Sequence, residues 1–137
     1  MARRLQPRRL RPAHGRGWFF HEPVYGISFY LFQCPYNEMV PVLGRIGIHI
    51  ARCEKEPMGT SIMHEARNGA WHYVIWLEVS TDLRRPDGIN TLVHECAHTV
   101  LTALIKRGIN CDPGHQEPYC YYLGWLTEEC LKRLLAR

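Results

Sequence analysis

Apolar residues recur at intervals of three and four positions between about Gly88 and Arg107, which is the spacing of one buried helical face. The series is Ile89, Leu92, Val93, Cys96, Ala97, Val100, Leu101 and Leu104. Asp87 is placed to cap the start of this helix, and Gly108 follows the last periodic residues as a stop signal. The pattern therefore predicts a long amphipathic helix in the second half of the chain.

Strand signals precede this helix. Val24–Phe32 is rich in aromatic and β-branched residues, and Gly26 marks a bulge or a close approach within it. Asn68-Gly69, between Ser61–Ala66 and Ala70–Ser80, predicts a β-hairpin with a type I′ turn. In the second arm of that hairpin the odd positions are the apolar ones and are expected to face the helices: Tyr73, Ile75, Leu77 and Val79. The other face carries His72, Val74, Trp76 and Glu78.

Two further helices are expected. One follows Asn37 as its N-cap, tolerates Pro41 in its first turn and presents an apolar face from Met39 to Ile50. The other runs from Gln116 to about Leu135, with Pro118 in its first turn. Trp18–Phe20 forms either a core anchor or an exposed patch for a partner, and core burial is the favoured reading.

Composition fits one globular domain, with 46% hydrophobic and 22% charged residues in 137 positions. No apolar run is long enough to cross a membrane, and no apolar h-region follows the basic N-terminus, so neither a membrane span nor a secretory signal is expected. The six cysteines contain no CxxC pair, which favours reduced thiols in an intracellular setting.

The net charge of +4 is unevenly distributed, because residues 1–17 carry six arginines and no acid. These arginines are Arg3, Arg4, Arg8, Arg9, Arg11 and Arg16. We expect an extended basic arm over residues 1–17 and a single domain over residues 18–137. The arm either contacts a nucleic-acid backbone or an acidic protein surface, or remains a solvated tail; arginine without lysine favours contact, since guanidinium groups bind phosphate and carboxylate in a bidentate way.

The predicted long helix contains His94-Glu95-Cys96-Ala97-His98, an HExxH motif. His94 and His98 are one turn apart on the same side, so both imidazoles can bind one metal ion, and Glu95 beside them can take a proton from a water. The alternative is two histidines satisfied by ordinary backbone or carboxylate partners. The amphipathic context and a downstream ligand candidate favour a Zn²⁺ site, although other transition metals accept the same ligands.

A catalytic zinc site needs a third protein ligand. Glu117 is the favoured candidate because a helical hairpin would bring the start of the last helix back along the motif helix. His115 is the competitor, Cys111 a weaker one, and His64 and His72 on the hairpin are weaker still. Glu128 and Glu129 are expected to lie too far along the helix axis.

Two segments together resemble a known family. Leu92-Val93-His94-Glu95-Cys96-Ala97-His98 and, after a short loop, the run from Glu117 to Leu126 (EPYCYYLGWL) resemble the small HExxH proteins of bacteriophages and prophages, the minigluzincins of the zincin group. The resemblance covers about 40 residues well and the remainder by element order only. It implies an α+β fold in which a small three-stranded antiparallel sheet packs on the HExxH helix and a following helix, whose glutamate completes the zinc site.

The motif predicts a zinc-dependent hydrolase, a phage-encoded metallopeptidase in which Glu95 is the general base. Tyr121, one turn beyond Glu117, is the favoured oxyanion donor, with Tyr119, Tyr122 and His115 as alternatives. The rival hypothesis is a phage virion or assembly protein in which the metal is structural or vestigial. Partners would be a peptide or protein substrate, or a phage structural protein or nucleic acid bound by the arm. The expected location is the host cytoplasm or the virion.

Overall fold

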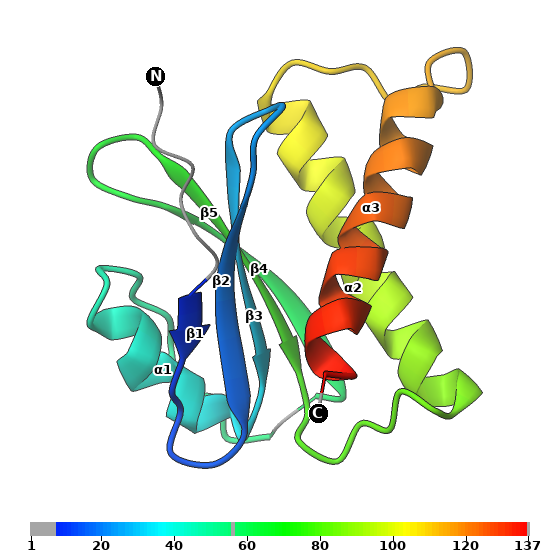
Figure 1. Cartoon of the computed structure of the whole chain (residues 1–137). Coiled ribbons are helices and arrows are strands. Elements are labelled where there is room, and N and C mark those ends of the chain that lie inside the picture. Colours follow the sequence, from blue (N-terminus) through cyan, green and yellow to red (C-terminus); the bar gives the residue numbers. More distant parts are fainter. Residues whose placement is uncertain (1–7, 56, 137) are drawn as a thin grey trace.

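The computed structural model describes residues 8–55 and 57–136, which form one mixed sheet with helices on both faces (Figure 1). The strands are β1 (Arg8–Leu10), β2 (Arg16–Glu22), β3 (Ile27–Gln33), β4 (Gly59–Glu65) and β5 (Trp71–Leu77). The helices are α1 (Tyr36–Gly44), α2 (Pro86–Lys106) and α3 (Glu117–Leu134). In the sheet the strands lie in the order β1-β2-β3-β5-β4, so β4 is an edge strand.

The three-stranded antiparallel sheet implied by the family resemblance is wrong. Five strands are present in the described residues, and β3 and β5 pair in parallel, with Ser28 beside His72 and Phe32 beside Trp76. The class remains α+β, but the sheet is mixed and larger than expected. No zincin arrangement of sheet and metal ligands is formed by the described part of the chain.

Val24–Phe32 was expected to be one strand. Its first residues, up to Gly26, instead form the turn between β2 and β3, and β3 begins at Ile27. Gly26 adopts a φ of 66° in the turn between β2 and β3, a conformation that glycine tolerates best. The Glu22 carboxylate accepts hydrogen bonds from the backbone N–H groups of Val24 and Tyr25, at 2.5 and 2.8 Å. Phe19 and Phe20 are buried in β2, so the core reading of the aromatic segment is confirmed for these two residues.

The basic arm is also partly a strand. Arg8–Leu10 pairs antiparallel with β2, and Arg16 is the first residue of β2. The Arg8 guanidinium lies 5.6 Å from the Phe19 ring centroid, and that of Arg16 lies 5.4 Å from the Trp18 ring centroid. Backbone pairing at a sheet edge depends little on the side-chain pattern, which is why this strand has no periodic signal. The expected arm residues 1–7, with Arg3 and Arg4, lie outside the described residues.

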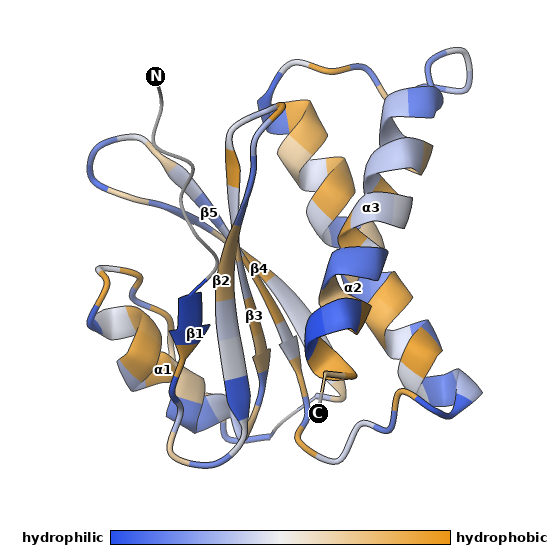
Figure 2. Ribbon diagram, in the orientation of Figure 1, coloured by the Kyte–Doolittle hydropathy of each residue, from blue (hydrophilic) through white to orange (hydrophobic). Residues whose placement is uncertain are grey.

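Both faces of the sheet are covered (Figures 1 and 2). Tyr73, Ile75 and Leu77 of β5 pack with α2 and α3, as the alternation predicted, whereas Val79, the fourth residue expected on this face, follows the end of β5 and is exposed. The opposite face is not polar: Val74 and Trp76 are fully buried in a second cluster with α1. Buried positions on both faces are expected for a strand that pairs in parallel at the centre of a sheet.

The predicted hairpin and the two later helices are present, but the expected type I′ turn is wrong. A type I′ turn requires a positive φ at both central residues, and among the described residues only glycines have a positive φ, so Asn68 does not. Gly69 has a φ of 80° in the β4–β5 turn, and Gly108 has a φ of 71° after the end of α2. Asp87 does not cap α2, because the helix begins one residue earlier and no side-chain capping bond is formed. None of the described helices is both long and apolar enough to span a membrane.

Candidate metal centre

The two motif histidines meet on the surface of α2. Their Nε2 atoms are 3.1 Å apart, and the rings are nearly perpendicular, with centroids 4.6 Å apart. Two nitrogens bound at 2.0–2.1 Å to one tetrahedral ion are about 3.3 Å apart. The observed separation therefore suits a shared metal ion as well as a direct hydrogen bond between the rings.

Glu95 belongs to α2, and its side chain lies against the edge strand β4. Its side chain is 8% exposed and is hydrogen-bonded to Ser61 of β4. Burial raises the pKa of Glu95, while His94, His98 and the Ser61 hydrogen bond act in the opposite direction. Gly59 allows the close contact between strand and helix, since a Cβ there would lie 2.9 Å from Thr91 Cγ2 and 3.2 Å from Glu95 Cγ.

A small pocket of about 120 Å³ opens between β4 and α2, with His98 in its wall. It is lined by Ser61, Ile62, Met63, Tyr73, His98, Thr99 and Thr102. Sequence reasoning did not single out Ser61 or Gly59. The sequence shows only that both residues belong to the strand before the Asn68-Gly69 turn. Their contact with α2 depends on the tertiary structure and cannot be predicted from that position.

The expected third ligand, Glu117, is not brought to the histidine pair. The described residues contain no group of three or more His, Cys, Asp or Glu side chains arranged to hold a metal ion. The reason is the register of the two helices. The Cys130 thiol is hydrogen-bonded to the Cys96 thiol, and Glu117 precedes Cys130 on the antiparallel α3 by 13 residues, or about 20 Å of helix.

The side of α2 that contacts α3 also differs from the side that carries the histidines. Cys96 is two positions from both His94 and His98, and residues two apart on a helix point in nearly opposite directions. Tyr121 is on α3, nine residues before Cys130, and its side chain is 70% exposed. Its role as oxyanion donor stays a prediction, as does the ligand role of Glu117.

Of the alternatives to Tyr121, Tyr122 has a structural environment. It is 1% exposed, and its hydroxyl donates a 2.9 Å hydrogen bond to Glu22 Oε2. Burial and the neighbouring Glu22 raise the pKa of the Tyr122 phenol far above its ordinary value. A phenol held in this way ties α3 to the β2–β3 turn. Tyr119 packs against the same core cluster and is partly buried.

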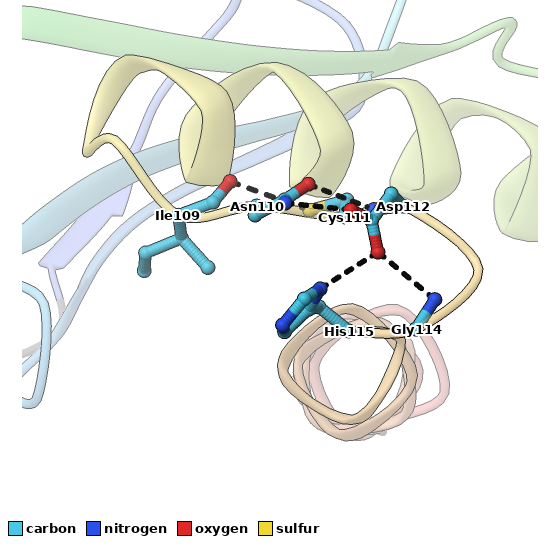
Figure 3. Close-up of polar contacts among 6 residues, drawn as sticks. All are labelled: Ile109, Asn110, Cys111, Asp112, Gly114 and His115. Atoms are coloured by element: carbon cyan, nitrogen blue, oxygen red, sulfur yellow. Dashed lines mark hydrogen bonds and ion pairs between the residues drawn. The ribbon is translucent and has the colours of Figure 1, made fainter.

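The loop before α3 holds the competitor His115 (Figure 3). Asp112 Oδ1 accepts hydrogen bonds from His115 Nδ1 at 2.7 Å and from the Gly114 backbone at 2.9 Å, and Asn110 binds the other carboxylate oxygen. This network lowers the pKa of Asp112, chiefly through His115. Cys111 donates a weak bond to the Ile109 carbonyl instead of facing the histidine pair.

The hairpin histidines lie on the other face of the sheet. His64 and His72 are directly opposite each other in β4 and β5, and Tyr30 Oη is 3.3 Å from His72 Nδ1. Burial, and then the nearby His64, lower the pKa of His72. Val74 and Trp76 are on the same face of the sheet as these two histidines, and that face packs with α1. The sheet therefore separates His64 and His72 from the HExxH pair.

This lowered pKa predicts a pH-dependent stability. The unfolded chain binds a proton at His72 more readily than the folded chain, so the free energy of unfolding falls as the pH drops below about 6.5. Between about pH 7.5 and pH 5, we expect the free energy of unfolding to fall less in His72→Phe than in the wild type. Urea unfolding at each pH measures this change. His49→Phe, at an exposed histidine, is the control. An unchanged pH dependence in the His72 variant would contradict the prediction.

Comparison with known protein families, with curated proteins and with solved structures finds no match to this chain.

Proposed function

We propose that this chain is a metal-dependent hydrolase of peptide bonds, with the metal held by His94 and His98. The observation that carries the proposal is the pair of Nε2 atoms 3.1 Å apart, with the buried Glu95 carboxylate on the same helix and an edge strand alongside. Imidazole nitrogens are frequent zinc ligands, and the third protein ligand that a catalytic zinc site needs is not brought to this pair by the described residues. A zinc ion bound there would polarise a substrate carbonyl and make a water nucleophilic at neutral pH.

The chain's own residues supply the proton transfer. Glu95 takes a proton from the attacking water and delivers it to the departing amine, which makes it both general base and general acid. A carboxylate whose pKa is raised by burial holds a proton more strongly than an exposed one, which suits this exchange. Ser61 fixes the orientation of the carboxylate through its hydrogen bond.

The edge strand β4 supports a peptide as the substrate class. It pairs with β5 on one side only, so its other backbone edge is open to an extended chain. The pocket of about 120 Å³ beside His98 has room for one side chain of such a peptide. The origin in a phage and the partner of the basic segment remain predictions.

Metal content tests the proposal directly. We expect purified wild-type protein to retain zinc after loading and dialysis. His94→Ala and His98→Ala are expected to weaken zinc binding by on the order of 100-fold or more, since loss of a mere supporting partner already costs roughly 10–100-fold. His49→Ala is the matched control at an exposed histidine outside the motif. Retention of zinc by both motif variants, or no zinc in the wild type, would reject the site.

A further inference from the structure

One edge of the sheet is strongly basic. β1 is the edge strand on that side, and Figure 2 shows it as largely hydrophilic. This strand and the residues after it carry four guanidinium groups, which we call the basic edge: Arg8, Arg9, Arg11 and Arg16. The first three are exposed, and none of the four forms an ion pair with a described residue. Unpaired cations on one edge attract an anionic partner.

The carboxylates in the same half of the chain are mostly engaged. Residues 8–55 contain seven Arg and Lys residues but only three Glu residues. Glu22 is buried and bonded to the β2–β3 turn and to α3, and Glu38 pairs with His14 at 2.6 Å. Residues 57–136, by contrast, contain seven Arg and Lys residues and nine acidic residues. The positive charge is therefore concentrated on the part of the molecule that contains β1, β2, β3 and α1.

Two groups of the basic edge are held against aromatic rings. The Arg8 guanidinium lies over the Phe19 ring, and that of Arg16 lies over the Trp18 ring. Such a contact orders a guanidinium group while leaving N–H donors for an oxyanion. Guanidinium planes and aromatic rings are also the surfaces on which unpaired nucleic-acid bases stack.

A row of polar side chains crosses the sheet from β2 to β4. The pairing registers place one residue from each of β2, β3, β5 and β4 side by side, and we call these four the histidine row: His21, Ser28, His72 and His64. All four are partly exposed, and none belongs to the buried cluster that α1 covers on this face. The row is therefore an accessible strip of the sheet beyond α1.

Arg8 connects the basic edge to the histidine row through Tyr30. Burial raises the pKa of the Tyr30 phenol, and the Arg8 guanidinium opposes that rise, so this charge lies near the hydroxyl. The hydroxyl oxygen is 3.3 Å from His72 Nδ1. His64 Nδ1 is buried without a hydrogen-bond partner among the described residues, so the row has hydrogen-bonding capacity that the protein does not use.

The face that carries the histidine row has no acidic residue in the described strands. Glu22 and Glu65, at the ends of β2 and β4, are at the alternate positions, opposite Ile27 and Trp71, which pack in the cluster with α2 and α3. Rings without neighbouring carboxylates can stack on bases and bond to their edges without repelling phosphates. A sheet four strands wide has room for about two or three stacked bases.

We propose that the basic edge and the histidine row together bind single-stranded nucleic acid. The arginines hold the phosphate backbone along β1, and the rings of the row contact the bases. Stacked guanidinium planes and imidazole rings favour a nucleic acid over an acidic protein, because carboxylate side chains offer no flat surface to stack on them. This interface is independent of the proposed metal site, since the sheet separates the histidine row from the HExxH pair.

The first test measures the backbone contacts. Fluorescence anisotropy of the full chain with a labelled oligothymidylate of about 12 nucleotides is expected to show salt-dependent binding. Arg8→Gln and Arg9→Gln should each weaken it by roughly 3–10-fold and lower the slope of log K against log salt by about 0.7. Arg85→Gln is the matched control, because it removes the same charge from an exposed arginine just before α2. No binding by the wild type, or equal weakening in all three variants, overturns the inference and leaves the proposed function standing.

The second test asks whether the bases are recognised. The oligothymidylate is expected to bind at least about fivefold more tightly than an abasic strand of the same length or a polyglutamate of the same charge, since stacking contributes about 1–3 kcal/mol per base. His21→Ala and His72→Ala should reduce this preference, whereas His115→Ala, at an exposed histidine before α3, should keep it. Circular dichroism of each variant establishes that the fold is retained. Equal affinity for the three probes would show a general attraction for polyanions, including acidic proteins, and would overturn the inference.

Discussion

Replacing Glu95 with glutamine is expected to lower the turnover number for peptide hydrolysis by roughly 10²–10⁴-fold while leaving the zinc content unchanged. Glutamine has nearly the same volume and still bonds to Ser61, but its amide cannot accept a proton at neutral pH. The site therefore keeps its shape and loses its general base. Hydrolysis of a fluorogenic peptide library, measured beside the zinc content of the same sample, checks both halves of this expectation.

The same substitution at Glu65, an exposed carboxylate at the end of β4, is the control and should leave turnover unaltered. Equal turnover in the Glu95 variant and the wild type would show that this carboxylate takes no part in proton transfer. Loss of zinc together with turnover would point to a structural role in holding the histidines.

Replacing Gly88 with alanine is expected to lower the free energy of unfolding by about 2–3 kcal/mol. An added Cβ would lie 2.1 Å from the Asp82 carbonyl oxygen and 2.7 Å from its carbonyl carbon. That oxygen also accepts the Arg85 N–H at 3.1 Å, so the backbone cannot move away without losing a hydrogen bond at the start of α2. Urea unfolding followed by circular dichroism measures the change.

Gly44→Ala is the matched control, because a Cβ there would meet nothing closer than His49 Nδ1 at 3.9 Å. Its stability should change by less than about 1 kcal/mol, in the stabilising direction, since alanine loses less entropy than glycine in a helix. A Gly88 variant as stable as the Gly44 variant would mean that the α2 start shifts freely against the preceding loop.

The helices and one hairpin were predictable because their signals are local. The three-and-four spacing placed α2 within two residues of its observed start, and Asn68-Gly69 specified the β4–β5 turn. The β2–β3 turn was missed because Val24 and Tyr25 have strand-forming side chains. Val24 is nevertheless 75% exposed, held in the turn by backbone bonds to the Glu22 carboxylate.

The candidate site was also predictable only where its signals in the sequence are local. One helical turn fixes the separation of His94 and His98, so their meeting followed from the sequence alone. The third ligand depends on how far α3 slides along α2, and the contact between Cys96 and Cys130 sets that register. Two buried cysteines carry no sign in the sequence that they will meet, so the distance of Glu117 from the motif could not be foreseen.

The parallel pairing of β3 with β5 also bears on how the chain folds. The β2–β3 and β4–β5 hairpins close over short loops, whereas Ser28 meets His72 only after α1 and the whole of β4 have been passed. Closing that long loop is entropically slow, so the central pair is expected to form last. Until it does, β3 presents an unpaired apolar edge containing Phe29 and Leu31, which is prone to join another chain. Refolding yield should therefore fall steeply with protein concentration, although both hairpins form within the first microseconds to milliseconds.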